Sequence, residues 1–213
     1  MFHHLSTLLG FPLITADGKR RAIRNFLFDD RSWQVRYLVV DAGKWFTPRL
    51  VVVPTSAVNL PDWTGKIIRT HLTAQEISAC PHAETVRPVS SQQKLAWNRH
   101  FGWRDKDPNW SGPSTIDFPR REFNVSDHCG DPHLRRTRDL ISYQVWTEDG
   151  YLGLLQGFLL GDGSWHIGYF LARTGDWIYG EKVLSSSSVV GISWGQGRVL
   201  VESQSDTIRQ EAS

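Results

Sequence analysis

Histidine, cysteine and aspartate side chains around the middle of the sequence are of the kinds that bind zinc. The candidate ligands are Cys80, His82, His128, Cys129, Asp131 and His133. Imidazole and thiolate groups suit zinc, but this spacing matches no common zinc motif. We therefore predict no metal site, while zinc binding by these groups stays open.

The sequence shows no arrangement of side chains that indicates catalysis. Gly191-Ile-Ser193-Trp-Gly195 matches the Gly-x-Ser-x-Gly pattern, but it leads into Gly195-Gln-Gly197, which is typical of a hairpin turn and not of the helix that follows a nucleophile elbow. Cys80 and Cys129 lie in Pro-rich surroundings without a helix N-terminus to lower the thiol pKa. The carboxylate pairs Asp29-Asp30 and Glu148-Asp149 could share a proton, but acidic residues before strands usually accept local amide hydrogen bonds. We predict that the protein is not an enzyme and has no catalytic residue.

Two glycine-containing segments could approach a phosphate group. Gly161-Asp-Gly163 and Gly195-Gln-Gly197 each contain two glycines, but neither leads from a strand into a helix as a nucleotide-binding loop does. Both are typical of hairpin turns, so we predict no cofactor.

Cations and tryptophans remain as the groups that could bind a partner. A basic cluster follows Asp17-Gly18, and three tryptophans that occur only once lie in the middle of the chain. Clustered cations attract acidic partners, and tryptophans anchor protein interfaces. The candidate partner surface consists of Lys19, Arg20, Arg21, Arg24, Trp97, Trp103 and Trp110. The alternatives are a solvated hairpin tip for the cations and packing of the tryptophans within the protein.

An internal repeat organises the elements that carry these groups. Asp149-Gly150 repeats Asp17-Gly18 at a distance of 132 positions, and an ungapped shift of this size matches many further residues. The matched pairs include Asp30/Asp162, Trp33/Trp165, Tyr37/Tyr169, Gly43/Gly175, Trp45/Trp177, Ser56/Ser188, Val58/Val190 and Gly65/Gly197. The chain is therefore predicted to contain two copies of one small module, with the recurring tryptophans in the core.

Each copy has the pattern of β structure. Asp17-Gly18 between apolar segments predicts a hairpin with a type I′ turn, because glycine tolerates positive φ freely and aspartate better than most residues. Residues 33–41 predict a strand with Trp33, Val35, Tyr37 and Val39 on one face. Further short strands are predicted at 50–53 and 65–72. So many short strands in so short a segment favour a small closed barrel, because a closed sheet has no unpaired edge strands.

Two short helices and a connector complete the predicted organisation. Thr73-Ala-Gln-Glu76 has the pattern of a capping box, and Pro81 would end the helix that it begins. A second short helix is predicted near 90–101. The predicted domains are a first barrel at 1–82, an aromatic and Pro-rich connector at 83–133 that packs on the barrels, and a second barrel at 134–213.

Composition limits the class of protein. The chain has 213 residues, 40% hydrophobic and 22% charged, with a net charge of +2, ten tryptophans and two cysteines. These values indicate a globular protein from a reducing compartment rather than a disordered or disulfide-rich one. The small net charge argues against a dedicated DNA-binding protein, and no apolar run is long enough for a transmembrane helix. We expect a cytoplasmic protein.

The repeated pattern resembles the PRC-barrel family, named for the cytoplasmic domain of the photosynthetic reaction-centre H subunit. The resemblance rests on Asp17-Gly18, Asp29-Asp30-x-Ser32-Trp33, residues 37–41, Trp45, Pro54, Val58, residues 72–77 and Pro81. The segments 87–103 and 131–134 resemble the connector of tandem PRC-barrel proteins of bacteria. The family usually has a glycine soon after the Asp-Gly turn; Gly153 keeps it, but Arg21 stands there in the first copy. The resemblance implies an all-β fold with minor α, in which two PRC-type barrels lie in tandem.

We expect the function to depend on binding surfaces rather than on catalysis. The leading hypothesis is a non-catalytic interaction or adaptor protein that docks to a protein partner or to a second copy of itself. By analogy with the family, one alternative is a membrane-peripheral regulator of electron or proton transfer at the inner face of the cytoplasmic membrane, in contact with anionic lipid. The other is a module that binds RNA during ribosome assembly.

Overall fold

The computed structural model describes residues 1–43, 49–83, 133–174 and 180–202. The predicted helix near 90–101 and the connector therefore lie outside the described residues, as do Trp45 and Trp177. Strands account for most of the described part of the chain, so the all-β prediction is confirmed.

The first sheet contains strands from the first half of the chain in the order β5-β4-β3-β2-β6. Their bounds are β2 (Pro12–Ile14), β3 (Arg20–Asp29), β4 (Val35–Asp41), β5 (Leu50–Pro54) and β6 (Ile68–Arg69). Neighbours are antiparallel except β2 and β6, which are parallel.

The second sheet repeats this order as β11-β10-β9-β8-β13-β12. Its strands are β8 (Gln144–Thr147), β9 (Gly150–Gly161), β10 (Ile167–Thr174), β11 (Glu181–Ser185), β12 (Val189–Ser193) and β13 (Arg198–Val201). Its parallel pair, β8 with β13, corresponds to β2 with β6. The same topology therefore occurs twice, which confirms the internal repeat.

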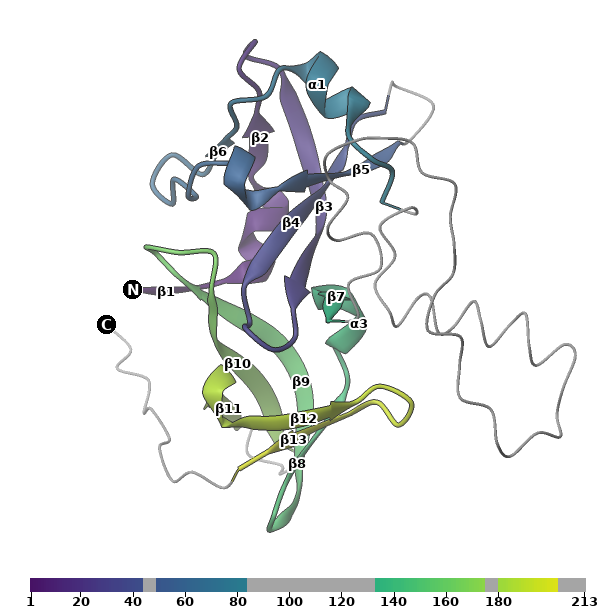
Figure 1. Cartoon of the computed structure of the whole chain (residues 1–213). Coiled ribbons are helices and arrows are strands. Elements are labelled where there is room, and N and C mark those ends of the chain that lie inside the picture. Colours follow the sequence, from purple (N-terminus) through teal and green to yellow (C-terminus); the bar gives the residue numbers. More distant parts are fainter. Residues whose placement is uncertain (44–48, 84–132, 175–179, 203–213) are drawn as a thin grey trace, which may run out of the picture.

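Each half gives one strand to the other sheet. Strand β1 (Phe2–His4) pairs with β9, and β7 (Leu134–Arg136) pairs with β3. Figure 1 shows that each of these pairs joins segments from the two halves of the chain. The two registers correspond, because His4 lies opposite Leu159 as Arg136 lies opposite Leu27. Each sheet thus contains one strand from beyond the boundaries predicted for its domain.

The helical elements are short. They are η1 (Leu5–Gly10), η2 (Thr55–Ala57), α1 (Ala74–Ala79), α3 (Thr137–Leu140) and η3 (Ser186–Ser188). The predicted capping box at α1 is confirmed, since Thr73 Oγ1 accepts from the Glu76 amide and Glu76 accepts from the Thr73 amide. Segments η1 and α3, which were not predicted, follow the two exchanged strands at equivalent positions.

Two recurring tryptophans lie buried where the halves meet. The backbone N–H of Val35 donates to Trp165 O at 2.7 Å, and that of Ile167 donates to Trp33 O at 2.8 Å. These two bonds flank an antiparallel bridge between Gln34 and His166. A single apolar cluster extends across the junction and includes residues of both halves. A pseudo-two-fold axis therefore passes through this bridge.

Two local predictions are wrong. The hairpin before β3 is not type I′, because only Gly18 has positive φ and the Thr15 amide donates to Lys19 O across a three-residue loop. Strand β4 does not present one continuous face, because a register shift at Arg36 turns Tyr37 away from the core that contains Val35. A bulge of this kind reverses which residues face inward.

The ungapped repeat is also wrong beyond the β4–β5 and β10–β11 connections. Tyr37 lies opposite Pro54, whereas Tyr169 lies opposite Ser185, so the second copy is shorter by one residue there. From that point the shift is 131. Lys66 (φ 50°) thus corresponds to Gly197 (φ 62°), and Gly65/Gly197, Ser56/Ser188 and Val58/Val190 are not equivalent pairs.

Closure of each half into a barrel is not seen. Among the described strands, each sheet is an open path whose end strands do not pair with each other. The structure therefore establishes two mixed sheets with matching topology.

Candidate interaction surfaces

The predicted basic cluster lies at the β2–β3 turn and along the start of β3, and its four side chains have different surroundings. Lys19 Nζ lies 3.2 Å from Asp17 Oδ2, and an Arg24 Nη lies 3.0 Å from Asp41 Oδ2. Arg20 is exposed, whereas Arg21 is partly buried, and its Nε is enclosed without a hydrogen-bond partner. Two of the four cations are therefore paired with carboxylates of the same half.

Asp17 holds the turn to the first helix. Its carboxylate accepts hydrogen bonds from the Thr15 hydroxyl at 2.6 Å and from the Ala74 backbone N–H at 2.9 Å. Both hydrogen bonds hold the pKa of Asp17 far below its ordinary value, and the one from Thr15 has the larger effect. The turn role predicted for Asp17 is confirmed, and its charge also caps α1.

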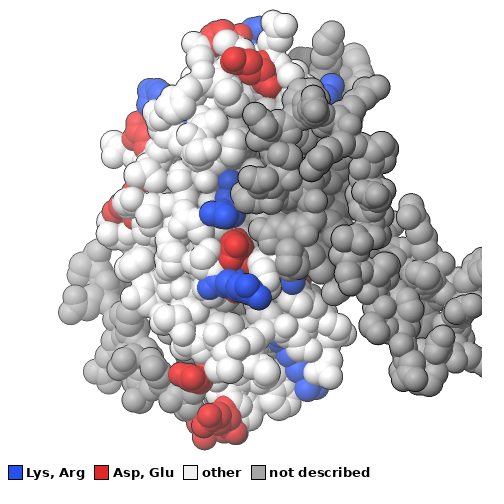
Figure 2. Space-filling view, viewed as in Figure 1, with Lys and Arg blue, Asp and Glu red and all other residues white. Residues whose placement is uncertain are grey.

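Cations on the visible face of the molecule are interspersed with carboxylates. Figure 2 shows the Lys and Arg side chains in separate small groups, several beside an Asp or Glu, rather than in one broad area. Trp97, Trp103 and Trp110 lie outside the described residues. The candidate partner surface as a whole stays a prediction.

A buried polar cluster at the junction was not anticipated. Arg135 Nε donates to Asp30 Oδ2 at 2.8 Å, and His133 Nδ1 lies 2.9 Å from Asp30 Oδ1. The Arg135 guanidinium also lies over the ring of Trp194, 4.1 Å from its centre. Because Arg135 is only 5% exposed, this ion pair joins the halves in the interior.

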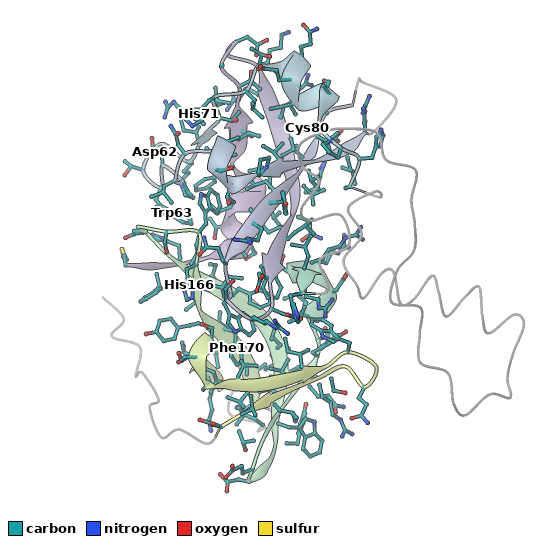
Figure 3. All side chains as sticks on the ribbon, in the orientation of Figure 1. Asp62, Trp63, His71, Cys80, His166 and Phe170 are labelled. Atoms are coloured by element: carbon teal, nitrogen blue, oxygen red, sulfur yellow. The ribbon has the colours of Figure 1, made fainter. Side chains whose placement is uncertain are left out.

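The same arrangement recurs across the pseudo-two-fold axis. Asp162 binds His3 Nε2 and the amino group of Met1, as Asp30 binds Arg135 and His133. His3 stacks on Trp63 at 3.9 Å between ring centres, and Figure 3 shows Trp63 near the junction of the two halves. The repeat of Asp30 at Asp162 was the sequence signal that could have revealed these contacts.

Asp29 and Asp30, the adjacent carboxylates that precede β4, have different roles. Partial burial alone would raise the pKa of Asp29, but the backbone amides of Ser32 and Arg31 donate to it and hold the pKa below its ordinary value. Asp30 instead reaches across the junction to Arg135. Asp29 therefore has the predicted turn role, whereas Asp30 has a tertiary one.

The zinc-type residues are only partly described. Cys80 donates from Sγ to the Glu76 carbonyl, and burial raises the pKa of this thiol. His133 lies against Asp30, while His128, Cys129 and Asp131 lie outside the described residues. Within the described ranges, no three such side chains gather as a metal site would require.

The outer faces of the two sheets differ in how well they are covered. In the first half, Leu27, Tyr37, Val39, Val52, Ala83 and Leu134 form a buried cluster on the outer side of β3–β5. The equivalent set in the second half is Phe2, Leu159, Tyr169, Leu171 and Val183, here called the second outer face. Phe2 is 51% exposed and packs edge-on against Tyr169, whereas its counterpart Leu134 is 1% exposed. Only Leu171 of this face is fully buried.

No model of a known family matches the chain, and no curated protein is similar to it. In the described part of the chain, no helix is long and apolar enough to cross a bilayer.

Proposed function

We propose that the protein is a non-catalytic interaction module, built from two PRC-type barrels in tandem, that docks to a protein partner or to a second copy of itself. The doubled sheet order and the resemblance of the repeated motifs support the fold assignment. The docking role rests on the second outer face, where apolar side chains stay accessible at positions that are buried in the first half.

The exposure of Phe2 on the second outer face, at a position that is buried in the first half, is the observation that carries the proposal. The two halves share the order of their strands, yet Phe2 is exposed where its counterpart Leu134 is buried. Accessible apolar residues that lie together on a sheet are typical of protein–protein contact surfaces.

The test uses the full chain in two assays. Light scattering reports self-association, and affinity capture from the native host at low salt, repeated with the captured protein as bait, reports a partner. We expect a dimer or a reciprocal partner that is lost in Phe2→Asp and kept in Leu200→Asp, a matched change at an exposed apolar residue of β13. A monomer without a reciprocal partner would overturn the proposal.

The same preparation tests the alternatives. Binding to anionic vesicles that disappears in a Lys19→Ser, Arg20→Ser, Arg21→Ser variant would favour the membrane-peripheral regulator. RNA binding that weakens steeply with salt would favour the ribosome-assembly module.

A further inference from the structure

The first half adds an extra extended segment to the edge of its sheet. The Val52 backbone N–H donates to Pro81 O at 3.0 Å, and the Ala83 N–H donates to Leu50 O at 2.8 Å. Val51 and His82 form an antiparallel bridge between these two bonds. These bonds satisfy the outward N–H of Val52 and C=O of Leu50, and Ala83 packs into the outer cluster.

The corresponding edge in the second half is β11. The register places Val183 at the position of Val52 and Glu181 at that of Leu50. In β11 the backbone groups of residues 181, 183 and 185 therefore point away from β10, and the Ser185 C=O accepts a hydrogen bond from the Ser188 hydroxyl at 2.7 Å. None of the strands described pairs with this edge. An open strand edge is a template for pairing with another chain.

We propose that β11 pairs antiparallel with β11 of a second copy of this chain, about a two-fold axis at Val183. The inference deepens the proposed function and rests on its self-association branch. Pairing of one surface with itself gives the closed two-fold dimer that is commonest among homo-oligomers.

The backbone limits which registers are possible. Only residues 181, 183 and 185 have outward N–H and C=O groups, so they must lie opposite one another in the two copies. Centring the pair on Val183 uses all three positions and places Glu181 opposite Ser185. A pair centred on Glu181 would oppose two like charges, and one centred on Ser185 would leave Glu181 unpaired. A pair centred on Lys182 or on Leu184 would join only two of the three positions, and the former would oppose two lysines.

The side chains agree with this register. Val183 belongs to the second outer face beside Leu171, so its contact with the same residue of the second copy would extend that apolar strip across the axis. On the other side of the sheet, Lys182 would lie opposite Leu184, which its aliphatic stem can cover. The pairing thus supplies the second half with the edge cover that Pro81–Ala83 gives the first.

The experiment places opposite charges on the axis. Light scattering at several concentrations is applied to the full chain, to Val183→Glu, to Val183→Lys and to an equimolar mixture of the two variants. The control is Val190→Glu, the same change at a 66% exposed valine on β12, the other end strand of this sheet. Circular dichroism and thermal unfolding verify that each variant is folded.

We expect the wild-type chain and Val190→Glu to dimerise. The dissociation constant should rise by at least about tenfold in each single Val183 variant, because two like charges face each other on the axis. The mixture should recover a dimer, because Glu then faces Lys.

Other outcomes overturn the inference, and they separate it from the proposed function. If both Val183 variants dimerise as tightly as wild type, the β11 pairing is excluded, but self-association still stands. The same holds if the single variants are monomeric and their mixture does not form a dimer. A monomeric wild-type chain excludes the inference, and the proposed function then depends on the capture of a reciprocal partner.

Discussion

Asp30 and Arg135 come from opposite halves of the chain, and their side chains are 8% and 6% exposed. Removing one member of a buried pair leaves the other charge without compensation. We expect Asp30→Asn to lower the free energy of unfolding by about 3–5 kcal/mol in urea titrations. The exposed pair Arg24–Asp41 is the control, because Arg24→Gln should cost about 1 kcal/mol or less. Equal losses in both variants would contradict the role assigned to Asp30.

Asp17 gives stability a dependence on pH. Its pKa in the folded protein is lowered from an ordinary value of 3.8, chiefly by the Thr15 hydroxyl. A lowered folded pKa means stability that is complete above the unfolded pKa and is lost as pH falls toward the folded pKa. The free energy of unfolding should therefore decrease below about pH 4.

The Asp17 contribution can be isolated with two variants. Asp17→Asn should flatten the decrease in unfolding free energy below pH 4, and Thr15→Val should flatten it in part, because that change removes the strongest hydrogen bond to the carboxylate. Acid titrations followed by circular dichroism measure the slopes. Slopes that match wild type in both variants would contradict the assignment.

At the level of the strands, Gly153 marks a close approach between β9 and β10 of the second sheet. A Cβ at this position on β9 would lie 1.9 Å from the carbonyl oxygen of Arg173 on β10. Gly153→Ala must therefore move one strand, and we expect a loss of about 2 kcal/mol or more in unfolding free energy. Gly163→Ala, where a Cβ meets nothing within 4 Å, should change stability little. A Gly153 variant as stable as this control would contradict the close approach.

Local patterns predicted some elements well and others badly. The capping box of α1 needs only contacts between Thr73 and Glu76, which lie within one turn, so the sequence was sufficient to predict it. The faces of β4 were predicted wrongly, because the bulge at Arg36 depends on pairing with β3. In the first half, Arg21 stands at the position that corresponds to Gly153.

At the scale of the whole molecule, strand exchange makes the two halves interdependent. Unfolding one half would remove β1 or β7 from the sheet of the other and open the shared core around Trp33 and Trp165. We expect one cooperative thermal transition, with equal calorimetric and van't Hoff enthalpies and coincident fluorescence and circular dichroism curves. Two resolved transitions would show that the halves unfold independently.

The sequence by itself determined the features that repeat or that act over a few residues. Paired aromatics at a constant distance indicated the duplication, and turn and cap residues located the hairpin before β3 and the helix α1. These signals are local, because hydrogen bonds between residues two to four positions apart need no other part of the chain.

The tertiary structure alone decided which strands belong together. Nothing in the segments around Phe2 and Leu134 states that each joins the other half, since a short strand can pair with any open edge. The contacts of Asp30 with Arg135 and the unequal cover of the two outer faces depend on this exchange. Pairing between distant segments is fixed by the burial of whole surfaces, which no local pattern encodes.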